Sequence, residues 1–280
     1  RRVVSALAMG AAVFFAWYPL PGFFLGRDEG VLGHSAQRIL AGELPHRDFN
    51  ALYTGGLELL HAATFLLLGR DLYHLRLVLF AVFLAWLPLV YYVARRFVGS
   101  WGALVITVLA TVGGVGHSPS PLPNWYGLFL GTATIVAHLR FWDTARWRWL
   151  FVAGLASGLA MLIKITGLYL LAGSLFFLGF HALLRDRPAF ELSENGRHPL
   201  GYPVFFTVTG AIFLSLMLAL LWGVGRKGEY LVFFSPGLFL TGALVWQAWA
   251  QPRRPLLAEV KRLIPRVGLI LAGFSLPVIA

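Results

Sequence analysis

Long apolar runs separated by short charged segments form most of the chain. A transmembrane helix needs about 20 predominantly apolar residues to cross the hydrocarbon core of a bilayer. Seven runs have this character, and each predicts one membrane-spanning helix. These runs are Val3–Leu25, Leu75–Ala94, Trp101–Gly116, Asn124–Leu139, Tyr202–Trp222, Leu231–Ala250 and Val267–Ala280.

A further run, Leu150–Leu184, is too long for a single crossing. Its 35 residues would extend about 52 Å as one helix, so we expect it to fold back as a hairpin of two spans. The turn is predicted near Lys164, which is the only Lys, Arg, Asp or Glu of the run, and near the flexible Gly167. The predicted fold is therefore an all-α, polytopic membrane bundle of about nine spans.

The apolar segment Gly55–Leu68 is short and contains Glu58 and His61, so a second criterion must decide whether it crosses the membrane. Cytoplasmic loops carry more Lys and Arg than external loops. If the segment lies at the outer surface, 15 basic residues are inside and 8 outside; if it crosses, the numbers become 7 and 16. We therefore expect a cytoplasmic N-terminus and a first outer loop over residues 26–74.

That outer loop contains six of the twelve acidic residues of the chain. Within it, Val31–Ala41 predicts an amphipathic helix at the membrane surface, because its apolar residues recur at helical spacing on one face. Gly42 and Pro45 are expected to end this helix.

Composition agrees with a membrane protein. The chain is 58% apolar and 12% charged, with a mean hydropathy of +0.74, whereas soluble domains carry about 25% charged residues. The net charge of +11 comes from small basic clusters between apolar runs, which is typical of cytoplasmic membrane loops and argues against nucleic-acid binding. The chain has no cysteine, so disulfides and thiol chemistry are excluded.

Both ends of the sequence resemble cut ends, since it starts at Arg1 and stops at Ala280 inside an apolar run. We expect residues 1–280 to be one membrane module from the N-terminal part of a longer protein.

Asp28 and Glu29 directly follow the first predicted span. A carboxylate pair at the membrane boundary can accept a proton from an attacking hydroxyl or hold a divalent cation beside a phosphate. The alternative is a solvated loop end, because charged residues normally flank spans. Asp48 and His46, in the sequence LPHRDFN, offer further polar groups; for Asp48 the alternative is a surface salt bridge with Arg47 or Arg38.

Lys164 is the most informative single residue, because an ammonium group inside a long apolar run is costly and indicates function by default. The predicted hairpin places it on the same outer side as Asp28, where it can contact an anionic phosphate of a lipid carrier. The alternative is a lysine that extends toward the outer headgroups.

Four segments, in this order, resemble the GT-C superfamily of integral-membrane glycosyltransferases, in particular bacterial relatives of protein O-mannosyltransferases and of lipid A aminoarabinose transferases. They span about the first two-thirds of the chain. The segments are RDEG at 27–30, RILAGELPHRDFN at 38–50, NWYGLFLG at 124–131 and GLASGLAMLIKITGLYLL at 154–171.

The resemblance implies an inverting glycosyltransferase that uses a polyprenyl-phosphate-linked sugar on the extracytoplasmic face of a bacterial inner membrane. It also implies two juxtamembrane helices in the first outer loop. By position, Asp28 matches the catalytic acidic residue of the family and Glu29 its neighbour, while Lys164 matches a lysine that in some relatives approaches the donor phosphate. Asp48 matches an acidic residue of less defined role.

The sequence departs from the family at two places. Residues 53–56 replace a Pro-Pro or Lys-Pro pair, and Asn124 stands where some relatives carry an acidic residue. Asn124 and His46 remain candidate substrate-binding residues. A divalent cation is an open question, with Asp28 and Asp48 as its candidate ligands. The sugar and the acceptor stay undefined, and a lipid flippase or transporter remains the alternative function.

Overall fold

The computed structural model describes residues 2–22, 27–115, 117–184, 201–224, 227–250 and 256–279. These residues form eleven α-helices and one short 3-10 helix, with no β-strand among them. In chain order the helices are α1 (Arg2–Trp17), α2 (Arg27–Leu40), α3 (Gly56–Leu68), α4 (Leu72–Ala94), α5 (Ser100–Val112), α6 (Pro123–Thr144), α7 (Arg148–Ile163), η1 (Ile165–Gly167), α8 (Leu168–Leu184), α9 (Gly201–Val224), α10 (Lys227–Ala250) and α11 (Leu256–Ile279).

The all-α membrane class predicted from the apolar runs is confirmed. A helix occupies the position of every predicted span, and α2 and α3 occupy the predicted outer loop. Among the described residues, three stretches are long and apolar enough to cross a membrane: Leu72–Ala94, Ile165–Ala182 and Lys261–Ile279. The number of nine spans stays a prediction.

The first two helices differ from their predicted bounds. The first helix ends at Trp17 rather than Leu25. Pro19 and Pro21 follow soon after, and they do not continue a helix because proline cannot donate a backbone hydrogen bond. The second begins at Arg27 rather than Val31, with Asp28 and Glu29 in its first turn. Carboxylates are favourable there because they face the positive end of the helix dipole.

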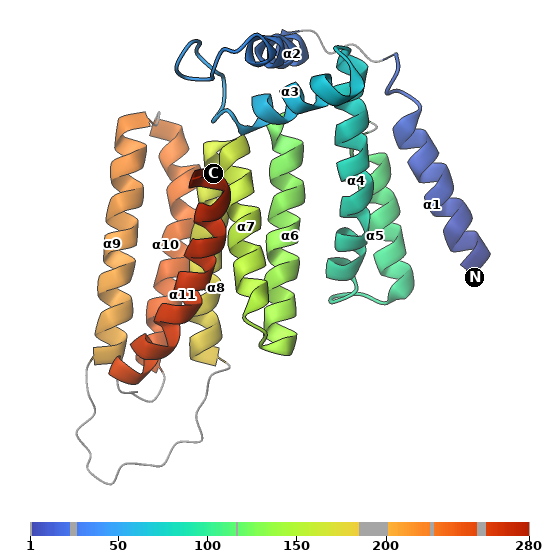
Figure 1. The fold of residues 1–280 in the computed structure, drawn as a ribbon. Coiled ribbons are helices and arrows are strands. Elements are labelled where there is room, and N and C mark those ends of the chain that lie inside the picture. Colours follow the sequence, from blue (N-terminus) through green and yellow to red (C-terminus); the bar gives the residue numbers. More distant parts are fainter. Residues whose placement is uncertain are drawn as a thin grey trace, which may run out of the picture. The chain divides into compact units, whose positions relative to one another are not determined.

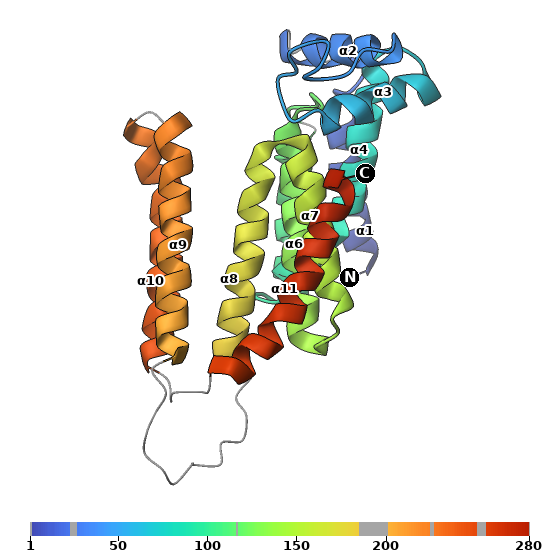
Figure 2. The same cartoon turned by 60° about the vertical axis from the view of Figure 1, so that its left-hand side comes forward.

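The chain forms two compact units, one of residues Arg1–Leu171 with Ile270–Ala280 and one of residues Ala172–Leu269. The expectation of a single module over residues 1–280 stays a prediction. In the first unit, α2 and α3 lie across one end of α4, α6 and α7 (Figures 1 and 2). Two juxtamembrane helices in one connecting segment are the arrangement expected for the first outer loop.

Aromatic side chains fill the centre of the first unit between α4 and α6. The ring centroid of Trp86 lies 5.2 Å from that of Phe129 and 5.9 Å from that of Phe83. Trp86 also donates a hydrogen bond of 2.9 Å from its indole nitrogen to the Thr132 hydroxyl. These contacts pack α4 and α6 against each other.

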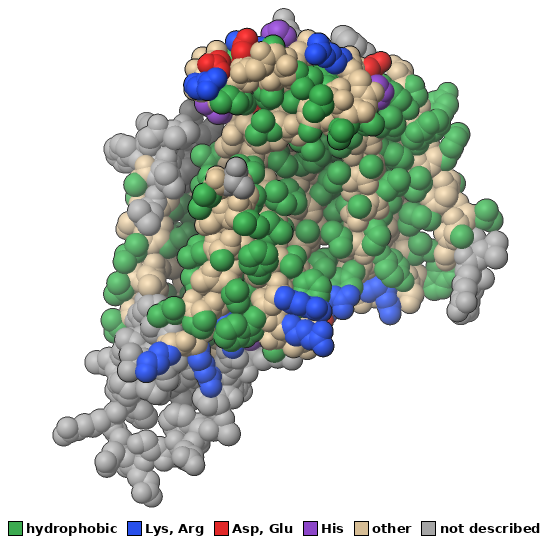
Figure 3. All heavy atoms as spheres, viewed as in Figure 1, with side chains coloured by type: hydrophobic (Ala, Val, Ile, Leu, Met, Phe, Trp, Pro, Cys, Tyr) green, Lys and Arg blue, Asp and Glu red, His purple; other side chains and the backbone are tan. Residues whose placement is uncertain are grey.

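Charge is distributed unevenly between the two ends of the first unit. At the end opposite α2 and α3, Arg96 forms an ion pair with Asp143 and Arg140 lies over the Tyr92 ring. Figure 3 shows basic side chains at both ends, whereas the clearly visible acidic side chains lie at the end formed by α2 and α3. This pattern agrees with the charge count of the sequence, and the membrane orientation stays a prediction.

The predicted turn of the long apolar run is present. α7 ends at Ile163, Lys164 is extended with φ −156° and ψ 137°, and η1 follows. A Cβ atom on Gly167 would overlap the backbone of Ala160 and Met161. Only glycine therefore allows the chain to fold back this closely on α7.

Glycines on α7 and on the C-terminal part of α11, residues 270–279, allow these two segments of the first unit to pack directly against each other. Cβ atoms on Gly154 and Gly158 would overlap the carbonyl oxygens of Ile270 and Phe274, and one on Gly273 would overlap that of Phe151. Small side chains are the usual means by which membrane helices approach closely. The glycine-rich part of the segment GLASGLAMLIKITG is therefore explained by packing, whereas its lysine is not.

The second unit contains the pair α9 and α10, which pack together. Phe206, Leu244 and Ala248 form its buried core. Gly210 on α9 allows Thr241 on α10 to lie close to the α9 backbone, since a Cβ atom on Gly210 would lie 2.6 Å from the threonine Cγ2.

Candidate functional site

The N-terminal turn of α2 is fixed to α4 by a buried ion pair. Glu29 is only 2% exposed, and its two oxygens accept hydrogen bonds of 2.6 and 2.7 Å from Arg76. Arg76 also donates to the backbone oxygen of Leu20 at 2.8 Å. Two parallel hydrogen bonds between a guanidinium and a carboxylate define both distance and orientation. The Glu29 side chain thus points into the protein.

Asp28, the preceding residue, is exposed. Its carboxylate lies close enough to Tyr53 to act on the phenol electrostatically. Burial raises the pKa of the Tyr53 hydroxyl, and the negative charges of Asp28 and then Glu58 raise that pKa further. The acidic residue at the start of α2 and the tyrosine of the following loop therefore interact electrostatically.

The segment that carries Tyr53 is held by polar contacts of the loop before it. His46, which has a positive φ of 64°, forms a hydrogen bond of 2.7 Å from its Nε2 to the Tyr53 carbonyl oxygen. Asp48 accepts hydrogen bonds from the Leu44 amide at 2.8 Å and from Arg47 at 2.7 Å. The hydrogen bond from Arg47, followed by the one from Leu44, lowers the pKa of Asp48.

Residues 53–56 attach this loop to the end of α7. The Thr54 hydroxyl donates toward the carbonyl oxygens of Met161 and Leu162, at 2.8 and 2.5 Å. Gly55 has a φ of +99°, and a Cβ atom on Gly56 would lie 2.5 Å from the Leu162 oxygen. The two glycines are therefore required by a left-handed turn and by a close backbone approach.

Lys164 lies two residues after Leu162, where the loop is attached to α7. Its Nζ donates a hydrogen bond of 2.9 Å to Oδ1 of Asn124 at the start of α6. The same Nζ lies 5.8 Å from the centroid of the Tyr53 ring, within the range of a cation–π interaction. The lysine ammonium is therefore held at a defined place by residues of α6 and of the loop before α3.

Glu58 and His61 are fully buried on α3, and neither has a hydrogen-bond partner among the described residues. Burial lowers the pKa of His61 to about 4. His61 is consequently neutral near pH 7 and supplies no positive charge to the site.

The structure thus brings Lys164 and Asn124 together beside Tyr53, with His46 bound to the Tyr53 backbone. The charge of Asp28 acts on Tyr53, and the part of Asp28 in the site stays a prediction. Glu29 faces Arg76 instead, and Asp48 is exposed and paired with Arg47, as in one of the two interpretations of the sequence. The sequence analysis noted residues 53–56 only as a departure from the family, and it gave no role to Tyr53, Thr54 or Arg76. Of these, only Arg76 gave a signal, since it is a charged residue inside an apolar run.

No group of three or more His, Cys, Asp or Glu side chains that could hold a metal ion occurs in the described part of the chain. Of the two candidate ligands, Asp48 already binds Arg47 and Leu44. A metal ion at Asp48 would have to displace these contacts, and metal binding by Asp28 and Asp48 stays a prediction.

A family model described as "Dolichyl-phosphate-mannose-protein mannosyltransferase" matches residues 57–191. The matched range includes Asn124 and Lys164, whereas Asp28, Glu29, His46 and Asp48 precede it. No significant match was found among curated proteins or among solved structures. The family match and the apolar helices together indicate an integral membrane protein of the glycosyltransferase class. The match confirms the resemblance seen in the sequence and supports a GT-C-like glycosyltransferase.

Proposed function

We propose that the chain transfers a sugar from a polyprenyl-phosphate donor to an acceptor hydroxyl on the extracytoplasmic side, with inversion at the anomeric carbon. The observation that supports this most strongly is the position of Lys164. Its ammonium is held by Asn124 and Tyr53, at the same end of the first unit as Asp28. A proton acceptor and a phosphate-binding cation that both interact with one tyrosine suit displacement at a sugar phosphate.

Asp28 acts as the general base in this proposal. Its carboxylate takes the proton of the acceptor hydroxyl while the hydroxyl oxygen forms a bond to the anomeric carbon. Its exposed position at the start of α2 leaves room for an acceptor to approach. The conformation of this turn depends on the buried pair of Glu29 and Arg76, so we assign Glu29 a positioning role.

Lys164 stabilises the leaving group. As the bond between the anomeric carbon and the phosphate oxygen breaks, its electron pair stays on the lipid phosphate, which gains negative charge. A fixed ammonium opposite that charge lowers the barrier, because it is already in place when the charge develops. Asn124 occupies one donor direction of the ammonium, and two N–H groups remain for phosphate oxygens.

His46 and Asp48 support the loop that carries Tyr53. Both are exposed, yet their hydrogen bonds go to loop backbone and to Arg47. We propose that they hold the loop in place and that neither binds a divalent cation.

The test uses the chain in proteoliposomes loaded with a polyprenyl-phosphate mannose whose sugar is labelled. A glycosyltransferase releases polyprenyl phosphate and forms a labelled product with acceptors from a membrane extract. A flippase instead moves the intact donor between leaflets without cleavage. Cleavage that depends on Lys164 supports the proposal, with Arg148→Gln at the opposite end as control. Movement of intact donor without cleavage contradicts it.

A further inference from the structure

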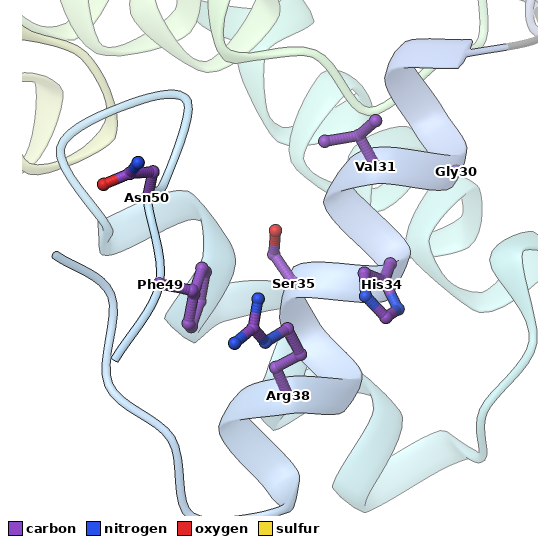
Figure 4. Close-up of a pocket in the computed structure, with 7 residues that line it drawn as sticks. All are labelled: Gly30, Val31, His34, Ser35, Arg38, Phe49 and Asn50. Atoms are coloured by element: carbon purple, nitrogen blue, oxygen red, sulfur yellow. The ribbon is translucent and has the colours of Figure 1, made fainter. Parts of the chain in front are cut away.

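An open groove of about 470 Å³ lies between α2 and the loop that follows it (Figure 4). Figure 4 shows Val31, His34, Ser35 and Arg38 along α2, with Phe49 and Asn50 on the loop facing them. Gly30 completes the lining. None of these residues has a part in the proposed transfer chemistry.

The groove occupies the face of α2 that is turned away from the rest of the first unit. Leu32 and Ala36, on the other face, are buried and pack against residues of α3 and α4. His34 is exposed and Val31 is 48% exposed. A ligand can therefore enter the groove without displacing the packed face of the helix.

The groove begins next to the proposed base. Val31 follows Asp28 by three residues, or about one helical turn. From Asp28, His34 lies about 9 Å and Arg38 about 15 Å farther along the helix axis. On the loop side, Asn50 is three residues before Tyr53. A bound chain that reaches from Arg38 to the start of α2 would present its end to Asp28.

The groove lining is mostly apolar, but it includes the hydrogen-bonding side chains of His34, Ser35, Arg38 and Asn50 and contains no carboxylate. Arg38 is fixed by an ion pair with Glu43 through its Nε and lies over the Phe49 ring, 4.6 Å from the centroid. Its Nη2 reaches the Asp48 carbonyl only at 3.4 Å, so the Nη edge keeps donor capacity. The nearby carboxylates of Glu43 and Asp48 are already paired with arginines.

We infer that this groove binds the acceptor, and that the acceptor is an elongated, hydroxylated chain with an anionic group, such as an acidic oligosaccharide. Its hydroxyl lies at Asp28, while its carboxylate or phosphate contacts Arg38 and His34. This inference rests on the proposed function, because it assigns the second substrate of the same site.

The test measures binding of three unlabelled probes to the chain in nanodiscs, in the absence of donor. Trimannuronate and mannotriose have the same length and differ in their carboxylates, and an uncharged threonine peptide represents a protein acceptor. We expect trimannuronate to bind most tightly. Loss of one charge-assisted contact in Arg38→Gln or His34→Gln should weaken its binding roughly tenfold.

Val31→Trp fills the groove without removing a polar contact, and it should weaken trimannuronate binding at least as much. Gln37→Trp places the same bulk on an exposed position of α2 outside the groove, and Arg70→Gln removes a charge elsewhere in the outer segment; both should bind as the wild type does. Equal binding of trimannuronate and mannotriose, tighter binding of the peptide, or no effect of Val31→Trp overturns the inference. A failure of donor cleavage in the proteoliposome assay would overturn the proposed function instead, since the binding assay contains no donor.

Discussion

Lys164 and Asn124, 40 positions apart in the chain, are joined by a hydrogen bond of 2.9 Å from the lysine Nζ to the asparagine Oδ1. A neutral amide positions the ammonium without neutralising its charge. An aspartate at the same place would form an ion pair and would lower the attraction for a phosphate.

Asn124→Asp is therefore expected to raise the KM for the polyprenyl-phosphate donor more than Asn124→Leu does. The leucine variant loses the positioning contact, whereas the aspartate variant adds a competing negative charge next to Lys164. Donor titrations of both variants at fixed acceptor concentration check this order. A lower donor KM in Asn124→Asp would show that Lys164 does not bind the phosphate.

The buried ion pair of Glu29 and Arg76 should stabilise the folded protein strongly, but only when both partners are present. Removing one partner, as in Glu29→Gln or Arg76→Met, leaves a buried charge without compensation and is expected to cost about 3–5 kcal/mol of stability. The double variant Glu29→Leu, Arg76→Met should recover much of that loss, because no buried charge remains. Thermal unfolding in detergent, monitored by circular dichroism, measures the stability of the two single variants and of the double variant. Additive losses in the double variant would argue against a direct pair.

Tyr53 should remain protonated at a pH where free tyrosine begins to ionise. Its pKa is raised by burial and then by the charges of Asp28 and Glu58, so its neutral form favours the folded state. This contribution is complete below the pKa of an unfolded tyrosine, about 10, and is lost as the pH rises through the higher folded value. The phenolate absorbance of the wild type minus that of Tyr53→Phe gives the titration of this residue. A midpoint at or below 10 would contradict the burial of its hydroxyl next to the carboxylates.

The attachment of the loop to α7 can be tested with a pair of glycine substitutions. Gly56→Ala places a Cβ atom 2.5 Å from the Leu162 oxygen, and the displacement should cost about 1–3 kcal/mol and reduce transfer. Gly127→Ala, on α6, meets no atom within 4 Å and should be neutral or stabilising by up to about 1 kcal/mol. The two variants are compared by their unfolding midpoints and by their transfer rates. Equal behaviour of both variants would mean that the close approach of α3 and α7 does not matter.

Features that depend on local patterns were predictable from the sequence. The hairpin turn follows from one charge and one glycine in a long apolar run. Counting basic residues on either side favours a surface position for α3, which stays a prediction. Contacts between distant residues were not predictable. Nothing near Glu29 in the chain indicates that its partner is Arg76, 47 positions later, and Tyr53 gains its place only because Thr54 and Gly56 attach its loop to α7.

The rate of transfer by Asp28→Asn tests the central claim most directly. Asparagine keeps the size and exposure of the side chain but cannot take the acceptor proton, so we expect transfer to fall by at least about 100-fold while thermal unfolding and donor binding stay near wild-type values. Asp143→Asn, at the opposite end of the first unit, provides the matched control and should retain activity. Near-normal turnover of Asp28→Asn in this assay would contradict the account.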